Sequence, residues 1–117
     1  MDTQSIVTYK SAFDAIMHEI MADDGSQMEV WYARELQQVC GYARWENFQV
    51  AINRAKDSCN SQNISIDDHF RDVTKTIPMP KGAQKEIKDV LLTRYACYLI
   101  AQNGDPKKEE IAFAQSY

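Results

Sequence analysis

The spacing of hydrophobic residues changes along this chain, and each spacing predicts one kind of element. Near the N-terminus they recur every three or four positions, as on an amphipathic helix: Ile6, Tyr9, Phe13, Ile16 and Ile20. The turn-forming run Asp23-Asp24-Gly25-Ser26 is expected to end that helix. The β-prone run at 30–32 then predicts a short strand of about two or three residues.

Two helical patterns follow in close succession. The first begins at Ala33, and Gly41 stands where a left-handed C-cap is expected. The second has its apolar stripe at Trp45, Phe48, Ile52 and Ala55. Two helices joined by a turn that contains glycine form a helix-turn-helix candidate. The same pattern also describes two packed helices that never meet DNA, and the sequence leaves both interpretations open.

A β-hairpin is predicted next. Residues 70–77 are rich in valine and threonine, and residues 86–91 form the returning strand. Between them, Pro78-Met79-Pro80-Lys81-Gly82 cannot continue a strand or a helix, because proline lacks the N–H donor and fixes φ. The hairpin therefore has a long tip at 78–85, with Lys81, Lys85 and Lys88 on or beside it. For Arg94, just beyond, pairing with an acid such as Asp89 is an alternative to phosphate contact or ordinary surface charge.

Two helices are predicted after the hairpin. Thr93 is the expected N-cap of the first, which ends at Asn103-Gly104, and Asp105-Pro106 starts the second. The second helix runs to the end of the chain without a stop signal, so we expect the natural protein to continue into a C-terminal region. Residues 1–117 thus predict a single α+β domain that resembles a winged helix: a helix-turn-helix, a β-hairpin wing and two C-terminal helices.

Charge changes this picture only in part. The net charge is −4, whereas proteins that bind phosphate backbones are usually basic. The distribution is uneven, however. Residues 1–33 hold six acids and one base, while residues 71–108 hold eight bases and four acids. A local field depends on arrangement as well as on the sum, so DNA stays a candidate partner.

Several functional classes find no support in the sequence. No apolar run has the length of a membrane span, and the N-terminus lacks a signal-peptide pattern, so a cytoplasmic protein is expected. Cys40, Cys59 and Cys97 do not form a disulfide or zinc pattern. Cys40 and Cys97 lie in apolar helical patterns and are expected to be small hydrophobes. Asp67-Asp68-His69 is more simply a solvated turn than a metal site. Without a nucleotide-binding or nucleophile motif, we expect no catalytic residues, metal or cofactor.

Three segments together carry a resemblance to a known family. These are Ala33-Arg34-Glu35-Leu36 with Gly41-Tyr42-Ala43-Arg44-Trp45-Glu46-Asn47-Phe48, then residues 81–87, and then residues 92–106. They resemble the N-terminal domain of the DNA-damage-inducible protein D family, which is similar to the Bro-N domain of phage antirepressors and baculovirus repeated-ORF proteins. The resemblance implies a bacterial protein under SOS control and a nucleic-acid-binding or regulatory module without known catalytic residues.

If the chain binds DNA, the expected contacts come from two elements. The second helix offers polar side chains suited to base or backbone contacts, namely Arg44, Asn47, Arg54 and Lys56. The wing offers lysines for phosphates, namely Lys81, Lys85 and Lys88. Gln49 and Asn53 are interpreted as a solvated helix face, and Trp31 and Trp45 as core residues.

A protein-interaction module is the competing interpretation. Its partner would be a protein of the recombination or repair machinery, or a second copy of the chain. The acidic N-terminal third would then face a basic partner. Self-association through Tyr98, Phe113 and Tyr117 also stays open.

Overall fold

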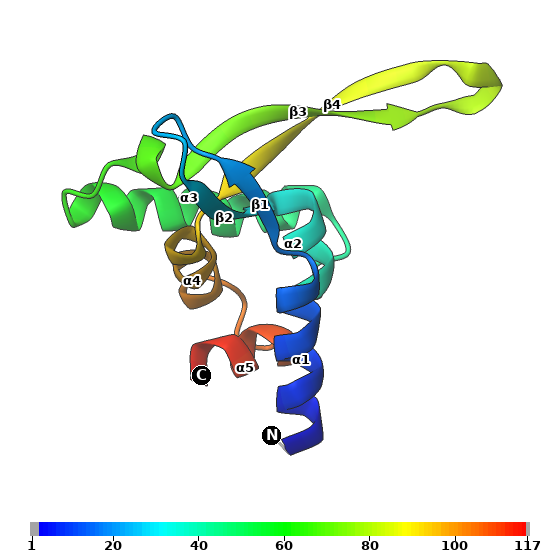
Figure 1. Ribbon diagram of the computed structural model, residues 1–117. Coiled ribbons are helices and arrows are strands. Elements are labelled where there is room, and N and C mark those ends of the chain that lie inside the picture. The colour runs from blue at the N-terminus through cyan, green and yellow to red at the C-terminus, as the bar shows by residue number, and fades with distance from the viewer. Residues whose placement is uncertain (1–2, 117) are drawn as a thin grey trace.

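The computed structural model describes residues 3–116, in which helices and strands are mixed along the chain (Figure 1). The elements are α1 (Thr3–Ala15), β1 (His18–Met21), β2 (Gln27–Tyr32), α2 (Ala33–Val39), α3 (Trp45–Ser61), η1 (Ile66–Asp68), β3 (Phe70–Pro78), η2 (Pro80–Gly82), β4 (Gln84–Leu92), α4 (Arg94–Gln102) and α5 (Glu109–Ser116). The α+β class is thereby confirmed. Within this range no helix is both long enough and apolar enough to cross a membrane.

The strands form one antiparallel sheet in the order β1-β2-β4-β3. β2 pairs with β1 through its first residues and with β4 through Trp31 and Tyr32, its last two. β3 and β4 stay paired from Phe70↔Leu92 out to Pro78↔Gln84. Only the root of this ribbon meets the body of the molecule. The rest projects as a two-stranded arm (Figure 1), and we call residues 73–88 the arm.

The core lies where α2, α3 and α4 pack against the sheet. Its largest fully buried side chains are Trp31, Phe48, Ile52, Leu92, Ile100 and Ile111. Trp31 is confirmed as a core residue: its ring stacks on Phe13 at 4.6 Å, and its Nε1 donates to the Phe13 carbonyl at 3.1 Å. All three cysteines are free and buried, which confirms the expectation for Cys40 and Cys97. Trp45 is half-buried beside this core.

The turn between α2 and α3 follows the sequence closely. Gly41 has φ +77°, a conformation that glycine adopts without steric cost. The Tyr42 N–H donates to the Gln37 carbonyl at 3.0 Å, and the buried Gln37 amide donates back to the Tyr42 carbonyl at 3.0 Å. α3 begins at Trp45, as predicted. It continues through Ser61.

The prediction of one N-terminal helix that includes Ile16 and Ile20 is wrong. α1 ends at Ala15, and Ile20 lies in β1, paired with Met28 of β2. Residues 23–26 are therefore the turn of a hairpin, in which the Asp24 side chain accepts from the Ser26 N–H at 2.9 Å. The helical spacing of hydrophobic residues predicts the structure correctly only within α1. Beyond it, the pairing of β1 with β2 determines the conformation. The expected role of the Ile6 side chain lies outside the described residues.

The last helix also begins later than predicted. Residues 105–108 form a turn in which the Asp105 carboxylate accepts from the Lys107 N–H at 3.0 Å, and α5 starts at Glu109. Asp105 therefore caps a turn before the helix. The expected exposure of the Phe113 and Tyr117 side chains lies outside the described part of the chain.

Candidate nucleic-acid interface

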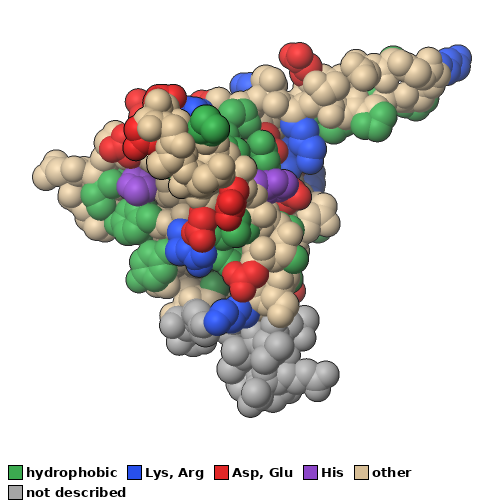
Figure 2. Space-filling view, in the orientation of Figure 1, with side chains coloured by type: hydrophobic (Ala, Val, Ile, Leu, Met, Phe, Trp, Pro, Cys, Tyr) green, Lys and Arg blue, Asp and Glu red, His purple; other side chains and the backbone are tan. Residues whose placement is uncertain are grey.

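The pairing register gives the arm two different faces, because directly opposed residues of an antiparallel ribbon lie on the same side. One face is polar and holds Thr74, Thr76, Gln84, Glu86 and Lys88. The other holds the half-buried Val73, Ile77 and Ile87 together with Lys75 and Lys85. Figure 2 shows hydrophobic side chains along one edge of the arm and a basic side chain at its end.

The tip is a tight, closed turn and is shorter than the predicted 78–85, because Pro78 ends β3 and pairs with Gln84 of β4. The Met79 N–H donates to the Ala83 carbonyl at 2.8 Å, and Pro80 opens the short η2 helix. Lys81 and Gly82 both have positive φ, at +64° and +76°, a conformation uncommon for a residue other than glycine. Met79 is 39% exposed, and Lys81 is exposed beside it. The tip therefore presents an apolar side chain and a cation together.

The arm is the basic part of the molecule. It holds four lysines, at positions 75, 81, 85 and 88, and its only acid is Glu86, which gives a net charge of +3. All four lysine side chains are exposed. The whole chain has a net charge of −4, so the positive arm separates positive from negative charge in space. Such a separation steers a polyanion toward the positive end of a protein.

A groove of about 690 Å³ lies where the arm leaves the body, between its root and α3. Trp45, Gln49 and Lys56 line it from α3, and Asp72 and Lys88 line it from the two strands. Of the candidates named from the sequence, Lys56 and Lys88 thus face one common groove. Gln49, which the sequence suggested to be ordinary surface, belongs to the same groove.

The remaining candidates of α3 lie elsewhere on that helix. Asn47 and Arg54 are seven positions apart and share one exposed side. Lys56 is two positions beyond Arg54, and at about 100° per residue it points away from that side by about 200°. Arg44 precedes the helix, is exposed, and lies 3.8 Å from Glu46. The candidates therefore divide between the groove and the exposed side of α3.

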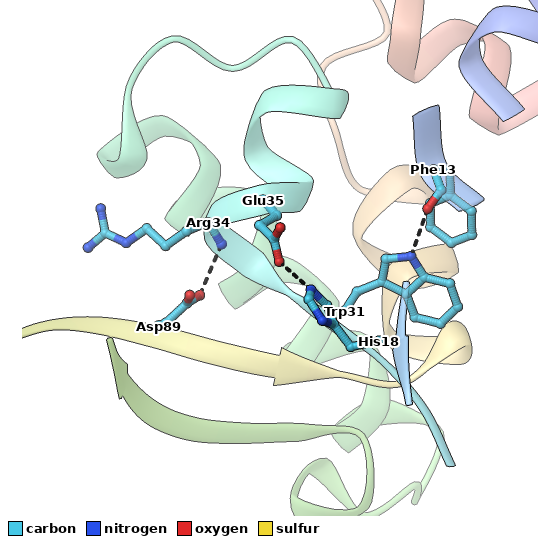
Figure 3. A network of polar contacts seen from close by, with 6 residues as sticks. All are labelled: Phe13, His18, Trp31, Arg34, Glu35 and Asp89. Atoms are coloured by element: carbon cyan, nitrogen blue, oxygen red, sulfur yellow. Dashed lines mark hydrogen bonds and ion pairs between the residues drawn. The ribbon is translucent and has the colours of Figure 1, made fainter. Parts of the chain in front are cut away.

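The root of the arm is fixed to α2 by Asp89, which is 1% exposed (Figure 3). Its Oδ1 accepts from the Arg34 N–H at 2.9 Å and from the Val90 N–H at 2.8 Å. Tyr32, the N-cap of α2, makes no side-chain capping bond, so a carboxylate from β4 takes that role. Asp89 Oδ2 has no hydrogen-bond partner among the described residues.

Arg34 extends this junction to α3. Its Nε donates to the Lys88 carbonyl at 2.9 Å, and its guanidinium lies 4.0 Å from the centre of the Trp45 ring. One arginine of α2 therefore contacts both the first residue of α3 and the arm, which lies far along the sequence. The sequence singles out Arg34 only as part of the Ala33-Arg34-Glu35-Leu36 segment, and its contacts with β4 and Trp45 are visible only in the structure.

Arg94 pairs with an acid, as the sequence suggests, but Asp89 is not the partner. Arg94 contacts Glu29 of β2 at 3.0 Å and lies 5.1 Å above the Trp31 ring. Asp89 is buried and already accepts two backbone N–H groups. Arg94 therefore holds β2 against the start of α4. His18 is exposed on β1, with its Nε2 2.7 Å from Glu35 (Figure 3).

Little in the described part of the chain suggests metal or thiol chemistry. No group of three or more His, Cys, Asp or Glu side chains is gathered there in a way that could hold a metal ion. His69 instead lies 2.7 Å from the Thr93 hydroxyl through its Nδ1. Burial raises the pKa of the Cys40 thiol to about 12 and that of Cys97 well above its ordinary value. Neither thiol is a nucleophile near neutral pH.

The segment that contains β2, helices α2 and α3 and the arm matches a known class of domain. The model of the BRO family, N-terminal domain, matches residues 23–116, so the chain belongs to that family. It is also 39% identical over 99 residues to DNA damage-inducible protein D of Escherichia coli (strain K12). That alignment covers 85% of this chain and 36% of the relative, so the chain spans little more than a third of that protein. No solved structure shows significant similarity.

Proposed function

We propose that this chain is a non-catalytic regulatory module that binds DNA in the cytoplasm during a bacterial SOS response. The observation that carries the proposal is the basic arm, whose exposed lysines extend from Lys88 in the groove at α3 to Lys81 at the tip. The link to DNA damage rests on the 39% identity to DNA damage-inducible protein D.

In this proposal α2 and α3 act as a helix-turn-helix and the arm acts as its wing. Nine paired residues at about 3.3 Å each make the ribbon roughly 30 Å long, close to one turn of the duplex. Lys56 and Lys88 contact phosphates at the groove, and Lys81 and Lys85 contact them further out. Arg44, Asn47 and Arg54 are proposed to meet the bases or backbone from the exposed side of α3.

The test is fluorescence anisotropy with labelled single- and double-stranded DNA from about 50 to 200 mM salt. We expect binding that weakens steeply with salt. The variant Lys81→Ala/Lys85→Ala/Lys88→Ala should bind more weakly, with a slope of log K against log salt that is smaller by about 2.7, because each lost phosphate contact removes about 0.9 on a duplex.

A matched control separates the arm from charge in general. Lys107 is exposed in the turn before α5, away from the arm. Lys107→Ala should leave the salt slope unchanged, whereas Lys81→Ala alone should lower it by about 0.9. If the wild-type chain binds neither form of DNA at low salt, the proposal is wrong.

One observation favours protein binding as a second candidate function. A cavity of about 430 Å³ opens between α1, α2 and α4, and it is lined mainly by apolar side chains such as Phe13, Val39 and Cys97. Tyr98 at its edge is 57% exposed. The proposed partner is a second copy of the chain or a recombination or repair protein. Tyr98→Ser should weaken self-association in analytical ultracentrifugation and leave DNA binding unchanged; equal sedimentation of both proteins as monomers would exclude the second copy.

A further inference from the structure

The end of the arm combines features that phosphate contact alone does not require. Pro78, Met79 and Pro80 form an apolar run at the outermost turn, and all three side chains are exposed. Met79 is one of four large hydrophobic side chains that are exposed in the described part of the chain. The β3–β4 ribbon carries this turn away from the core (Figure 1), and the arm holds four lysines. An apolar tip so placed fits a ligand that is both anionic and able to take up a hydrophobic side chain.

We propose that Met79 and Pro80 insert between base pairs from the minor groove and kink the duplex, so that the chain bends the DNA it binds. This inference rests on the proposed DNA binding and adds an activity to it. Proteins that kink DNA insert Met, Pro, Leu, Ile or Phe as wedges at one base step, with bends of about 20–90°. Unstacking the step costs a few kcal/mol, which contacts with the bent DNA offset.

The tip is built to be stiff, as a wedge must be. Both prolines have φ fixed by their rings, so little backbone freedom is left to lose on insertion. The Met79–Ala83 hydrogen bond closes the turn, and the positive φ of Lys81 and Gly82 reverses the chain within these few residues. Met79 itself is unbranched and adaptable, which suits it to the gap between two bases.

The lysines stand where a kinked duplex would need them. Lys81 directly follows the wedge, and Lys85 and Lys75 lie behind it on one face of the ribbon. The minor groove of straight B-DNA is about 6 Å wide, too narrow for a ribbon whose strands alone are about 4.8 Å apart. The tip therefore enters only where the groove opens, and the lysines behind it meet the phosphates on either side.

A substrate preference follows from this mechanism. A duplex with a mismatch or a nick has already lost part of its stacking, and it resists a kink less than an intact duplex does. The chain should therefore bind such a duplex several-fold more tightly than the intact duplex of the same sequence. For the mismatched duplex, phosphate contacts alone predict no such difference, because it carries the same number of phosphates as the intact duplex.

The experiment measures energy transfer between dyes at the two ends of a duplex of about 30 base pairs. Saturating wild-type chain should raise the transfer efficiency. Met79→Ser/Pro80→Ser should keep salt-dependent binding within about tenfold of wild type, because its lysines remain, and should lose both the rise in transfer and the preference for the mismatched duplex. Met79→Leu should retain both.

Met21→Ser is the matched control, since Met21 is 71% exposed on β1, away from the arm. It should bend DNA as the wild type does. If the wild type binds but leaves the duplex straight, or if Met79→Ser/Pro80→Ser bends it fully, the wedge is refuted and the proposed DNA binding stands. Absence of any binding by the wild type overturns both.

Discussion

Asp89 gives the sharpest test of how the arm is held to the body. Its carboxylate accepts from the backbone of Arg34, in the first turn of α2, and from the backbone of Val90. Asp89→Ala removes both hydrogen bonds and leaves two N–H groups without this acceptor. Asp89→Asn keeps an acceptor oxygen in nearly the same volume but removes the charge.

The size of the effect can be worked out from these contacts. Hydrogen bonds to a charged group contribute about 1.5–3 kcal/mol each, and the negative charge at a helix N-terminus adds about 0.3–1 kcal/mol. Asp89 Oδ2 is buried without a partner among the described residues. Its removal in Asp89→Ala offsets about 1–3 kcal/mol of the lost stability. We therefore expect Asp89→Ala to lower the free energy of unfolding by about 3 kcal/mol, and Asp89→Asn by roughly half as much.

Urea unfolding followed by circular dichroism measures both variants. The control is Asp72→Ala, because Asp72 is exposed on β3 and pairs in the ladder with Val90; it should change stability by less than about 0.5 kcal/mol. If Asp89→Ala is as stable as Asp72→Ala, the two hydrogen bonds do not hold the arm to α2. If Asp89→Asn is as damaging as Asp89→Ala, charge matters more than the acceptor.

Three further predictions concern the core and the caps. Thr93→Ala should lower stability by about 1 kcal/mol, because the hydroxyl accepts from the Ala96 N–H at 3.1 Å; Thr93→Ser should retain most of it in the same unfolding assay. Gly104→Ala should cost about 1–3 kcal/mol, since a Cβ there would lie 2.9 Å from Ile111, and an unchanged midpoint would contradict this packing. Burial raises the pKa of Cys40 from 9.0 to about 12, so the unfolded chain releases this proton first, and the contribution of Cys40 to stability is present below about pH 9 and lost between pH 9 and 12. Cys40→Ala should flatten that part of the stability–pH curve, and rapid reaction of the native thiols with a disulfide reagent at pH 8 would argue against their burial.

The sequence predicted the elements that depend on local signals. Gly41 follows α2 with a positive φ, and Thr93 caps α4. The prolines near 78–80 mark the tip of the hairpin. Each of these residues acts on its own few neighbours, so a short window contains the information.

The errors fall where a distant partner decides. Residues 18–21 follow a helical spacing but pair with β2, although Asp24-Gly25 before another β-prone run was a usable hairpin signal. Arg94 pairs with Glu29 because β2 lies beside it, and Asp89 accepts from the Arg34 N–H because α2 lies beside it. The groove could not be predicted either, because it depends on how the ribbon crosses α3.

The arm also leaves strand edges without a neighbour. β3 is the outer strand of the sheet, and its backbone groups on that side offer a template for pairing with another chain. Proline and lysine along an edge discourage such pairing, and the arm has Pro78 at the end of β3 and Lys75 within it. The lysines that would attract DNA thus also keep two arms apart. We expect arms without these lysines to pair more readily into cross-chain sheets.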